Sequence, residues 1–208
     1  MKKLAIICAG GFGREVACII NKLAEWDLMG FYDDGFETGI DTGYGVVIGS
    51  ISELNNVQEP IDVVLAIGNP EVANKIAARI TNPLVSFPNI IDSDAYFYDR
   101  DSLKIGKGNI IGPNASVSCN VTLGNFNVLN VFSQVGHDVV LGNHNVVMPS
   151  VNISGSVVIG DGNLFGVKST VIQGIKIGNN VTLAPNSVLT RNAKDDKTYL
   201  GNPAKIII

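Results

Sequence analysis

The chain has few of the side chains that most often bind metals or form disulfides. Its 208 residues include two histidines and three cysteines. Cys8, Cys18 and Cys119 form neither a ligand spacing nor a paired framework, so we expect them to be buried, small apolar residues. Catalytic zinc needs about three protein ligands, more than two histidines supply. The composition therefore predicts no metal site.

Runs of basic residues and long apolar segments are also missing. The net charge is −4, and the basic residues are not strung together, which argues against a nucleic-acid-binding protein. The opening apolar run, Leu4–Ala9, is shorter than the roughly 7–15 residues of a signal-peptide core, and no stretch approaches the ~20 residues of a membrane span. We expect a cytoplasmic protein with small-molecule partners and no contact with nucleic acid or membrane.

A six-residue repeat dominates the second part of the chain. From Ile105 to Leu189 every sixth residue is aliphatic or phenylalanine, and glycine often follows it. Apolar residues recur every 3.6 residues in a helix and every two in an ordinary strand. A strict period of six residues therefore predicts short strands broken by turns. The result is a prism with inward aliphatic files and corners of Gly, Asn and Asp. We expect an all-β parallel solenoid within a domain of residues 86–208.

The first 85 residues follow a different pattern. Buried strands are indicated within residues 3–9, 28–34 and 61–67, with a fourth candidate at 84–87. A helix follows the first of these strands, and another is expected from about Glu71 to Ile80. Strands that alternate with helices predict a parallel α/β sheet, so we assign residues 1–85 to a Rossmann-like domain that binds a nucleotide sugar.

Ligands of parallel sheets bind beyond the carboxyl ends of the strands. The glycine turn after the first strand offers backbone amides and the positive end of a helix dipole to a diphosphate. Acidic and amide side chains follow the second and third expected strands, where they can form hydrogen bonds with uridine and ribose. The candidate substrate-binding residues are Gly10, Gly11, Phe12, Gly13, Asp33, Asp34, Gly68 and Asn69.

Two other interpretations of this turn stay open. Asp33 lies about 20 residues downstream, as in dinucleotide-binding proteins, but AGGFG is not G-x-G-x-x-G and the chain has room for one mononucleotide half only. Alternatively, the glycines only allow the helix to pack closely on the strand.

Both histidines lie in the repeat. His137 comes two residues after the inward-pointing Val135, where a side chain leaves the prism near a corner, and Asp138 follows it directly. Histidine, with an unperturbed pKa near 6.5, suits general base catalysis at neutral pH, and an adjacent carboxylate fixes its tautomer. His144 has no such partner and is expected at a solvated corner.

These motifs together resemble a known family. The AGG-x-G loop, the Asp33-Asp34 pair, the IGN turn, the histidine followed by an acidic residue and the terminal G-x-P-A-K are similar to those of hexapeptide-repeat sugar O- and N-acetyltransferases. This family includes sialic acid O-acetyltransferases and N-acetyltransferases of UDP-4-amino sugars and GDP-perosamine. The resemblance covers nearly the whole chain. It implies a left-handed β-helix, acetyl-CoA as co-substrate, a homotrimer, His137 as general base and Asp138 as the group that raises its basicity.

The resemblance also implies an acetyl-CoA groove along the backbone around Val167 and Pro185, with Lys205 near its phosphate end. Asn130 is a candidate for orienting the acceptor. Three positions depart from the family. Many members have histidine at the position of Phe12 and glutamate at that of Asp138, and Val146 replaces a second histidine that bonds the thioester carbonyl. His144 lies two residues short of that position.

Charge distribution supports a coenzyme A site independently. No lysine or arginine lies between Lys107 and Lys168, whereas six follow from Lys168 onward against Asp195 and Asp196 only. This local excess suits a pyrophosphate and a 3′-phosphate. The six basic residues are Lys168, Lys176, Arg191, Lys194, Lys197 and Lys205.

The resemblance, together with these residues, implies an acetyl-CoA-dependent acetyltransferase. We expect N-acetylation of a nucleotide-linked amino sugar in the biosynthesis of surface-glycan precursors, with His137 as base. Acetylation of a hydroxyl of sialic acid or another sugar is an alternative, and a non-catalytic trimer that binds a nucleotide sugar is a second one. A zinc-dependent carbonic anhydrase with the same repeat needs three histidines per site, which this chain does not supply.

Overall fold

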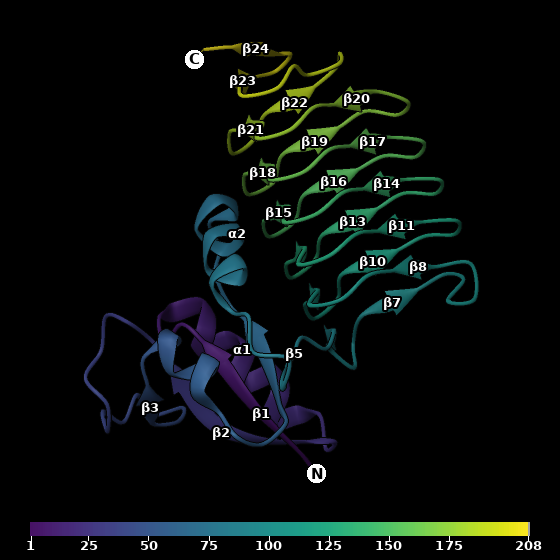
Figure 1. Ribbon diagram of the computed structural model, residues 1–208. Helices are drawn as coiled ribbons and strands as arrows, with labels where there is room; N and C mark the ends of the chain where they lie inside the picture. The colour runs from purple at the N-terminus through teal and green to yellow at the C-terminus, as the bar shows by residue number, and fades with distance from the viewer. Residues whose placement is uncertain (208) are drawn as a thin grey trace. The chain divides into compact units, whose positions relative to one another are not determined.

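The computed structural model describes residues 1–207, which fall into two compact units (Figure 1). The first unit is Met1–Ser93 and the second begins at Asp94, whereas the sequence pattern indicates a boundary after residue 85. Among the described residues, no helix is long and apolar enough to cross a membrane.

The first unit is built on a parallel sheet. Its elements are β1 (Lys2–Ile7), α1 (Gly11–Lys22), β2 (Trp26–Tyr32), β3 (Val47–Gly49), the 3₁₀ helix η1 (Ile51–Asn56), β4 (Ile61–Leu65), α2 (Pro70–Arg79), β5 (Val85–Ser86) and β6 (Ile90–Ile91). The strand order of the sheet is β3-β2-β1-β4-β5, and all four pairs are parallel. The prediction of a Rossmann-like α/β domain is confirmed.

The centre of this sheet forms the core of the unit. Four consecutive residues of β1, Leu4 to Ile7, are fully buried, as a central strand covered on both faces requires. α1 packs Val16 and Ile20 against the sheet, because these residues recur on one helical face. The chain places β2 and β3 on one side of β1, and β4 and β5 on the other. The topological switch point therefore lies between β1 and β4.

Neither β3 nor η1 was predicted. β3 is three residues long, and η1 follows it directly. A strand of this length shows no alternation of apolar and polar residues, so the sequence does not reveal it. The start of η1 is fixed by a capping box, in which the carboxylate of Glu53 accepts a hydrogen bond of 2.7 Å from the backbone N–H of Ser50.

The second unit is a parallel β-solenoid. Its strands are β7 (Tyr96–Phe97), β8 (Lys104–Ile105), β9 (Ile110–Ile111), β10 (Ser116–Val117), β11 (Thr122–Leu123), β12 (Val128–Leu129), β13 (Gln134–Val135), β14 (Val140–Leu141), β15 (Val146–Val147), β16 (Asn152–Ile153), β17 (Val158–Ile159), β18 (Leu164–Phe165), β19 (Thr170–Val171), β20 (Lys176–Ile177), β21 (Thr182–Leu183), β22 (Val188–Leu189), β23 (Thr198–Gly201) and β24 (Ala204–Ile206). β23 and β24 form an antiparallel hairpin at the end of the solenoid.

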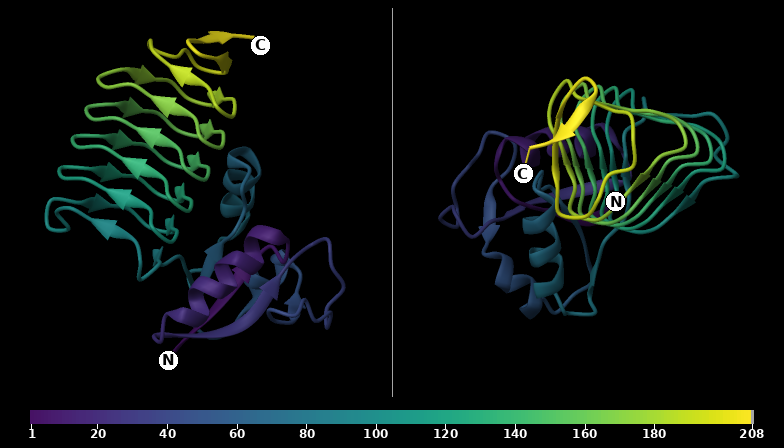
Figure 2. Two further views of the ribbon diagram at one scale, coloured as in Figure 1. Left: turned by 180° about the vertical axis from the view of Figure 1, so that it is seen from behind. Right: turned by 90° about the horizontal axis from the view of Figure 1, so that it is seen from above.

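The six-residue repeat sets the position of the strands. From β8 to β22 every strand has two residues, and its second residue is the repeating apolar one. These residues are buried from Ile111 to Leu189, so the inward files are confirmed. Successive strands belong to three different sheets, and from β7 to β19 each strand pairs with the strand three further along the chain, so that the coils stack (Figure 2). Three hexads thus make one coil.

The corners between the strands contain columns of residues with positive φ. The first corner has Asn114, Phe132, Ser150, Lys168 and Asn186, the second has Asn120, Asp138, Ser156 and Gly174, and the third has Gly108, Phe126, His144, Gly162, Asn180 and Asp196. Positive φ reverses the chain tightly, which explains the preference for Gly, Asn and Asp in these columns. Corner positions that recur every coil lie directly above one another.

A ladder of buried asparagines fixes the third corner. Asn127 accepts a hydrogen bond from the backbone N–H of Asn145 and donates through Nδ2 to the carbonyl oxygen of Gly142. Asn109, Asn145 and Asn163 lie in the same column, and each is buried. Buried amides need such partners, so the ladder holds neighbouring coils in register.

Candidate active site

The second corner presents His137 and Asp138 together. β13 ends at Val135, Gly136 begins the turn, and Asp138 adopts a φ of 58°. The two side chains are about half exposed, with 50% and 51% of their surface accessible. His137 Nδ1 lies 2.7 Å from Asp138 Oδ2. A carboxylate only accepts hydrogen bonds, so Nδ1 carries a proton, and in the neutral ring Nε2 then keeps a lone pair that can take a proton from a substrate.

Hydrogen bonds hold Asp138 in its charged form. The hydrogen bond with His137 is the main cause that lowers the pKa of the Asp138 carboxyl, and a hydrogen bond from Asn120 adds to it. Asp138 is therefore a carboxylate at neutral pH, available to stabilise an imidazolium at His137.

Gly155 lies next to the imidazole and was not among the residues predicted for the site. A β-carbon added at Gly155 would lie 2.4 Å from Nε2 and 2.5 Å from Cε1 of His137. The imidazole therefore occupies the space that any other side chain would fill. Gly155 comes eighteen residues after His137, which is one coil, so this spacing was the signal in the sequence.

His144 belongs to the third corner, and the structure does not place it with His137. Its ring stacks on Phe126, with centroids 5.0 Å apart and an angle of 13° between the planes. Its Nδ1 is buried and has no hydrogen-bond partner among residues 1–207. Burial lowers the pKa of His144, which favours the neutral ring.

Three other candidate residues gather at the first corner. Val167 and Pro185 follow β18 and β21, one coil apart, and a β-carbon on the neighbouring Gly166 would lie 2.6 Å from the nitrogen of Pro185. Asn130 lies at this corner too, where its Oδ1 accepts a hydrogen bond of 2.7 Å from the N–H of Val131. One side of the prism separates this corner from His137.

Val146 and Lys205 lie elsewhere. Val146 is in β15 rather than in a turn, and only 2% of its surface is exposed. Its aliphatic side chain cannot donate a hydrogen bond to a thioester carbonyl. Lys205 is an exposed residue of β24, opposite Leu200. The other five basic residues predicted to favour coenzyme A are exposed as well.

In the first unit, the predicted substrate-binding residues all follow the carboxyl ends of β1, β2 and β4, which are neighbours in the sheet. Both carboxylate oxygens of Asp33 accept a hydrogen bond of 2.7 Å from the backbone. Oδ2 accepts from the N–H of Ala9, and Oδ1 accepts from the N–H of Gly35. Asn69 caps α2 through a hydrogen bond of 3.1 Å from the N–H of Val72. These two side chains shape the loops around the switch point.

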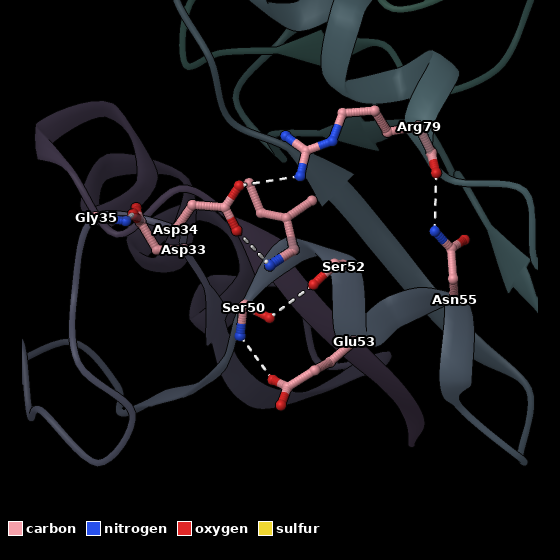
Figure 3. A network of polar contacts seen from close by, with 9 residues as sticks. Asp33, Asp34, Gly35, Ser50, Ser52, Glu53, Asn55 and Arg79 are labelled. Atoms are coloured by element: carbon pink, nitrogen blue, oxygen red, sulfur yellow. Dashed lines mark hydrogen bonds and ion pairs between the residues drawn. The ribbon is translucent and has the colours of Figure 1, made fainter.

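Asp34 is also engaged within the unit. Its Oδ1 accepts from the N–H of Ile51 at 2.9 Å, and its Oδ2 lies 3.2 Å from Nη2 of Arg79 (Figure 3). Asp34 thus ties the start of η1 to the end of α2. The sequence predicts that Asp34 is available to ribose or uridine, and in the structure its carboxylate also supports the loops on this edge.

The loop glycines have different roles. A β-carbon at Gly13 would lie 1.8 Å from the carbonyl oxygen of Cys8, so Gly13 allows α1 to pack closely on β1. Gly11, in contrast, is exposed and has no atom within 4 Å of an added β-carbon, and the same open space surrounds Gly68. Within the described part of the chain, no side chain caps α1. The amides of its first turn, which include Phe12, can therefore receive an anion.

Comparison with known proteins agrees with this architecture. The PglD N-terminal domain family matches residues 3–80, and the bacterial transferase hexapeptide family (six repeats) matches residues 156–191. The acetyltransferase domain of PglB from Neisseria gonorrhoeae FA1090 is 28% identical, with a TM-score of 0.92 over 100% of both chains. Its complex with acetyl coenzyme A is 30% identical, with a TM-score of 0.91 over 99% of both chains.

Two further matches are more distant or partial. PerB from Caulobacter crescentus, solved in complex with CoA and GDP-perosamine, is 23% identical with a TM-score of 0.91, over 100% of this chain and 98% of PerB, and it supports the fold. The uncharacterized protein L142 of Acanthamoeba polyphaga mimivirus is 33% identical over 127 residues, 60% of this chain. The match spans 24% of that longer protein.

An α/β unit joined to a left-handed β-helix of hexapeptide repeats, with a histidine and a carboxylate at an exposed corner, defines an acyltransferase of the hexapeptide class. Within that class the chain belongs to the acetyltransferases with a PglD N-terminal domain.

Proposed function

We propose that the protein transfers the acetyl group of acetyl-CoA to the amino group of a nucleotide-linked amino sugar, with His137 as general base. The contact of 2.7 Å between His137 Nδ1 and Asp138 Oδ2 carries this proposal. In the neutral ring this contact leaves the lone pair on Nε2, at a half-exposed corner where a substrate can reach it.

The chemistry requires one proton transfer at this position. The amine attacks the thioester carbonyl, a C–N bond forms, and the C–S bond breaks as the CoA thiolate leaves. The amine nitrogen loses its proton to Nε2 of His137, which passes it to the thiolate or to water. Asp138 stabilises the imidazolium while it holds that proton.

Acetyl-CoA is the co-substrate in this proposal. The PglB acetyltransferase domain, solved in complex with acetyl coenzyme A, matches 99% of this chain and supports the assignment. We assign the pantetheine groove to the first corner around Val167 and Pro185. The phosphates are assigned to the exposed basic residues toward the C-terminus, with Lys205 as the principal contact.

The acceptor is assigned to the first unit. The topological switch point between β1 and β4, with open space at Gly11 and Gly68, suits the diphosphate of a nucleotide sugar. The fold of PerB, solved with GDP-perosamine, is consistent with an amino sugar acceptor. We place the reaction in the cytoplasmic synthesis of surface-glycan precursors.

We further propose a homotrimer. Within one chain, His137 lies at the second corner whereas Val167 and Pro185 lie at the first. A closed threefold assembly brings the second corner of one chain against the first corner of its neighbour and gives three equal sites. Light scattering tests this point, since an active monomer of 22.0 kDa would contradict it.

An acceptor panel tests the proposed function. The purified protein is incubated with acetyl-CoA and either a UDP-4-amino sugar, GDP-perosamine or free sialic acid, and CoA release is measured beside the His137→Ala variant. We expect release with a nucleotide-linked amino sugar and a large loss in the variant. Release with sialic acid alone would support the hydroxyl alternative, and no transfer with any acceptor would support a non-catalytic binding role.

A further inference from the structure

Asn120 contacts Asp138 from the preceding coil of the second corner. Its Nδ2 donates a hydrogen bond of 3.2 Å to Asp138 Oδ1, across a spacing of 18 residues. The other oxygen of the same carboxylate, Oδ2, accepts from His137. Each oxygen of Asp138 therefore has one donor, and the three side chains form a continuous polar chain from Asn120 to the imidazole.

The backbone on both sides of this chain is fixed. Asn120 and Asp138 have φ values of 55° and 58°, so they occupy equivalent positions in the corner column. The N–H of Asn120 donates to Ser102 Oγ at 2.8 Å, and the N–H of Asp138 donates to the carbonyl oxygen of Cys119 at 3.0 Å. The amide of Asn120 is thus presented to Asp138 from an anchored turn.

We infer that Asn120 is a positioning residue, which holds the Asp138 carboxylate in the rotamer that accepts the proton of His137 Nδ1. This inference rests on the proposed role of His137 as base. An exposed carboxylate rotates freely and exchanges its partners with water, so a single bond to His137 would not fix its orientation. A second donor on the opposite oxygen restricts that rotation and keeps Nε2 in the unprotonated tautomer.

The chain offers a matched control at the third corner. Asn180 Nδ2 donates to Asp196 Oδ1 at 2.9 Å, and both residues have positive φ, so this pair copies the geometry of Asn120 and Asp138 without a histidine. A substitution at Asn180 reports what the loss of one such corner bond does to the fold alone.

The activity test compares Asn120→Ala with Asn180→Ala. We expect Asn120→Ala to lower kcat about 3- to 10-fold, with the KM of both substrates unchanged, because one hydrogen bond to a charged group is lost outside the substrate contacts. We expect Asn180→Ala to keep wild-type kcat, while the melting temperatures of the two variants fall by similar amounts. Equal kcat values for the two variants would overturn the inference.

The pH dependence of kcat/KM separates the two possible roles of Asn120, because a purely structural role would not shift this profile. Asn120→Asp keeps the size of the side chain but places a second carboxylate beside Asp138, which raises the pKa of His137 and moves the acid limb of the kcat/KM profile up by about 0.5 pH unit. Asn180→Asp is expected to leave this limb in place. An unchanged limb in Asn120→Asp would contradict the coupling.

Because the chain has two histidines, NMR of labelled imidazoles resolves the same shift without activity. His137 in Asn120→Asp is expected to titrate at higher pH, and His144 serves as an internal control. If His137→Ala remains fully active, the proposed function fails. If His137→Ala is inactive but the His137 titration in Asn120→Asp matches the wild type, only the role of Asn120 fails.

Discussion

The imidazole of His137 lies against the backbone of Gly155, one coil later at the second corner. The distance of 2.4 Å from Nε2 to an added β-carbon shows that the ring and a side chain at residue 155 exclude one another. The position of Nε2 is thus limited on one side by a glycine, while the hydrogen bond to Asp138 fixes the opposite side of the ring.

Gly155→Ala is therefore expected to affect catalysis more than stability. The new methyl group moves the imidazole, an exposed side chain that rotates at little cost, so the melting temperature should stay close to that of the wild type. A base displaced by about 1 Å loses on the order of 10²-fold in rate, so we expect kcat to fall by about 10-fold or more. Ser156→Ala, at the next position of the same turn, is the control. A Gly155→Ala enzyme with wild-type kcat would show that the ring tolerates displacement.

His137→Ala should remove the general base. We expect kcat to fall about 10²–10⁴-fold, or roughly 3–5 kcal/mol of transition-state stabilisation, with little change in either KM. Asp138→Asn should cost less and shift the pH profile toward acid, because loss of the carboxylate makes imidazolium less stable. Steady-state kinetics across the neutral pH range measure both effects. An active His137→Ala beside an inactive His144→Ala would assign the base to the third corner instead.

His144 should contribute to the pH dependence of stability rather than to catalysis. Burial lowers the pKa of His144 in the folded state, so the unfolded chain binds the proton more readily. The associated stability is fully present above the unfolded pKa, near 6.5, and is lost as the pH falls below it. His144→Phe keeps the stack on Phe126 and removes the titration, and Phe126 and Phe132 already adopt positive φ in corner turns.

Urea unfolding at about pH 7.5 and about pH 5.5, on either side of the unfolded histidine pKa, measures this difference. The wild type should lose more stability than His144→Phe between the two pH values, while kcat stays close to the wild-type value in the variant. An equal loss in both proteins would show that the proton on His144 is not linked to folding.

Gly11→Val and Lys205→Ala should separate the two substrates. The valine side chain has open space at Gly11, so the fold tolerates it, but it covers the amides at the start of α1 and should raise the KM of the acceptor strongly. Lys205→Ala should raise the KM of acetyl-CoA instead. Loss of affinity for the same substrate in both variants would contradict the assignment of separate sites.

Much of the fold follows from the sequence, because the six-residue period is set by the order of residues along the chain. A two-residue strand and a four-residue turn repeat along the chain whatever lies beside them, so the inward residues from Ile111 to Leu189 and the turn positions of His137 and His144 could be predicted. In the first unit, alternation of strands with α1 and α2 predicted the parallel sheet.

The tertiary structure alone decided how the site is assembled. The rotamer of Asp138, the asparagine that holds it and the glycine beside the imidazole come from three successive coils, and side-chain orientation depends on those neighbours rather than on the local period. The same reason applies to Asp33 and Asp34. Their place after β2 was predictable, but their carboxylates bind the N–H groups of Ala9, which follows β1, and of Ile51, at the start of η1. Only the folded chain brings these groups to one edge of the sheet.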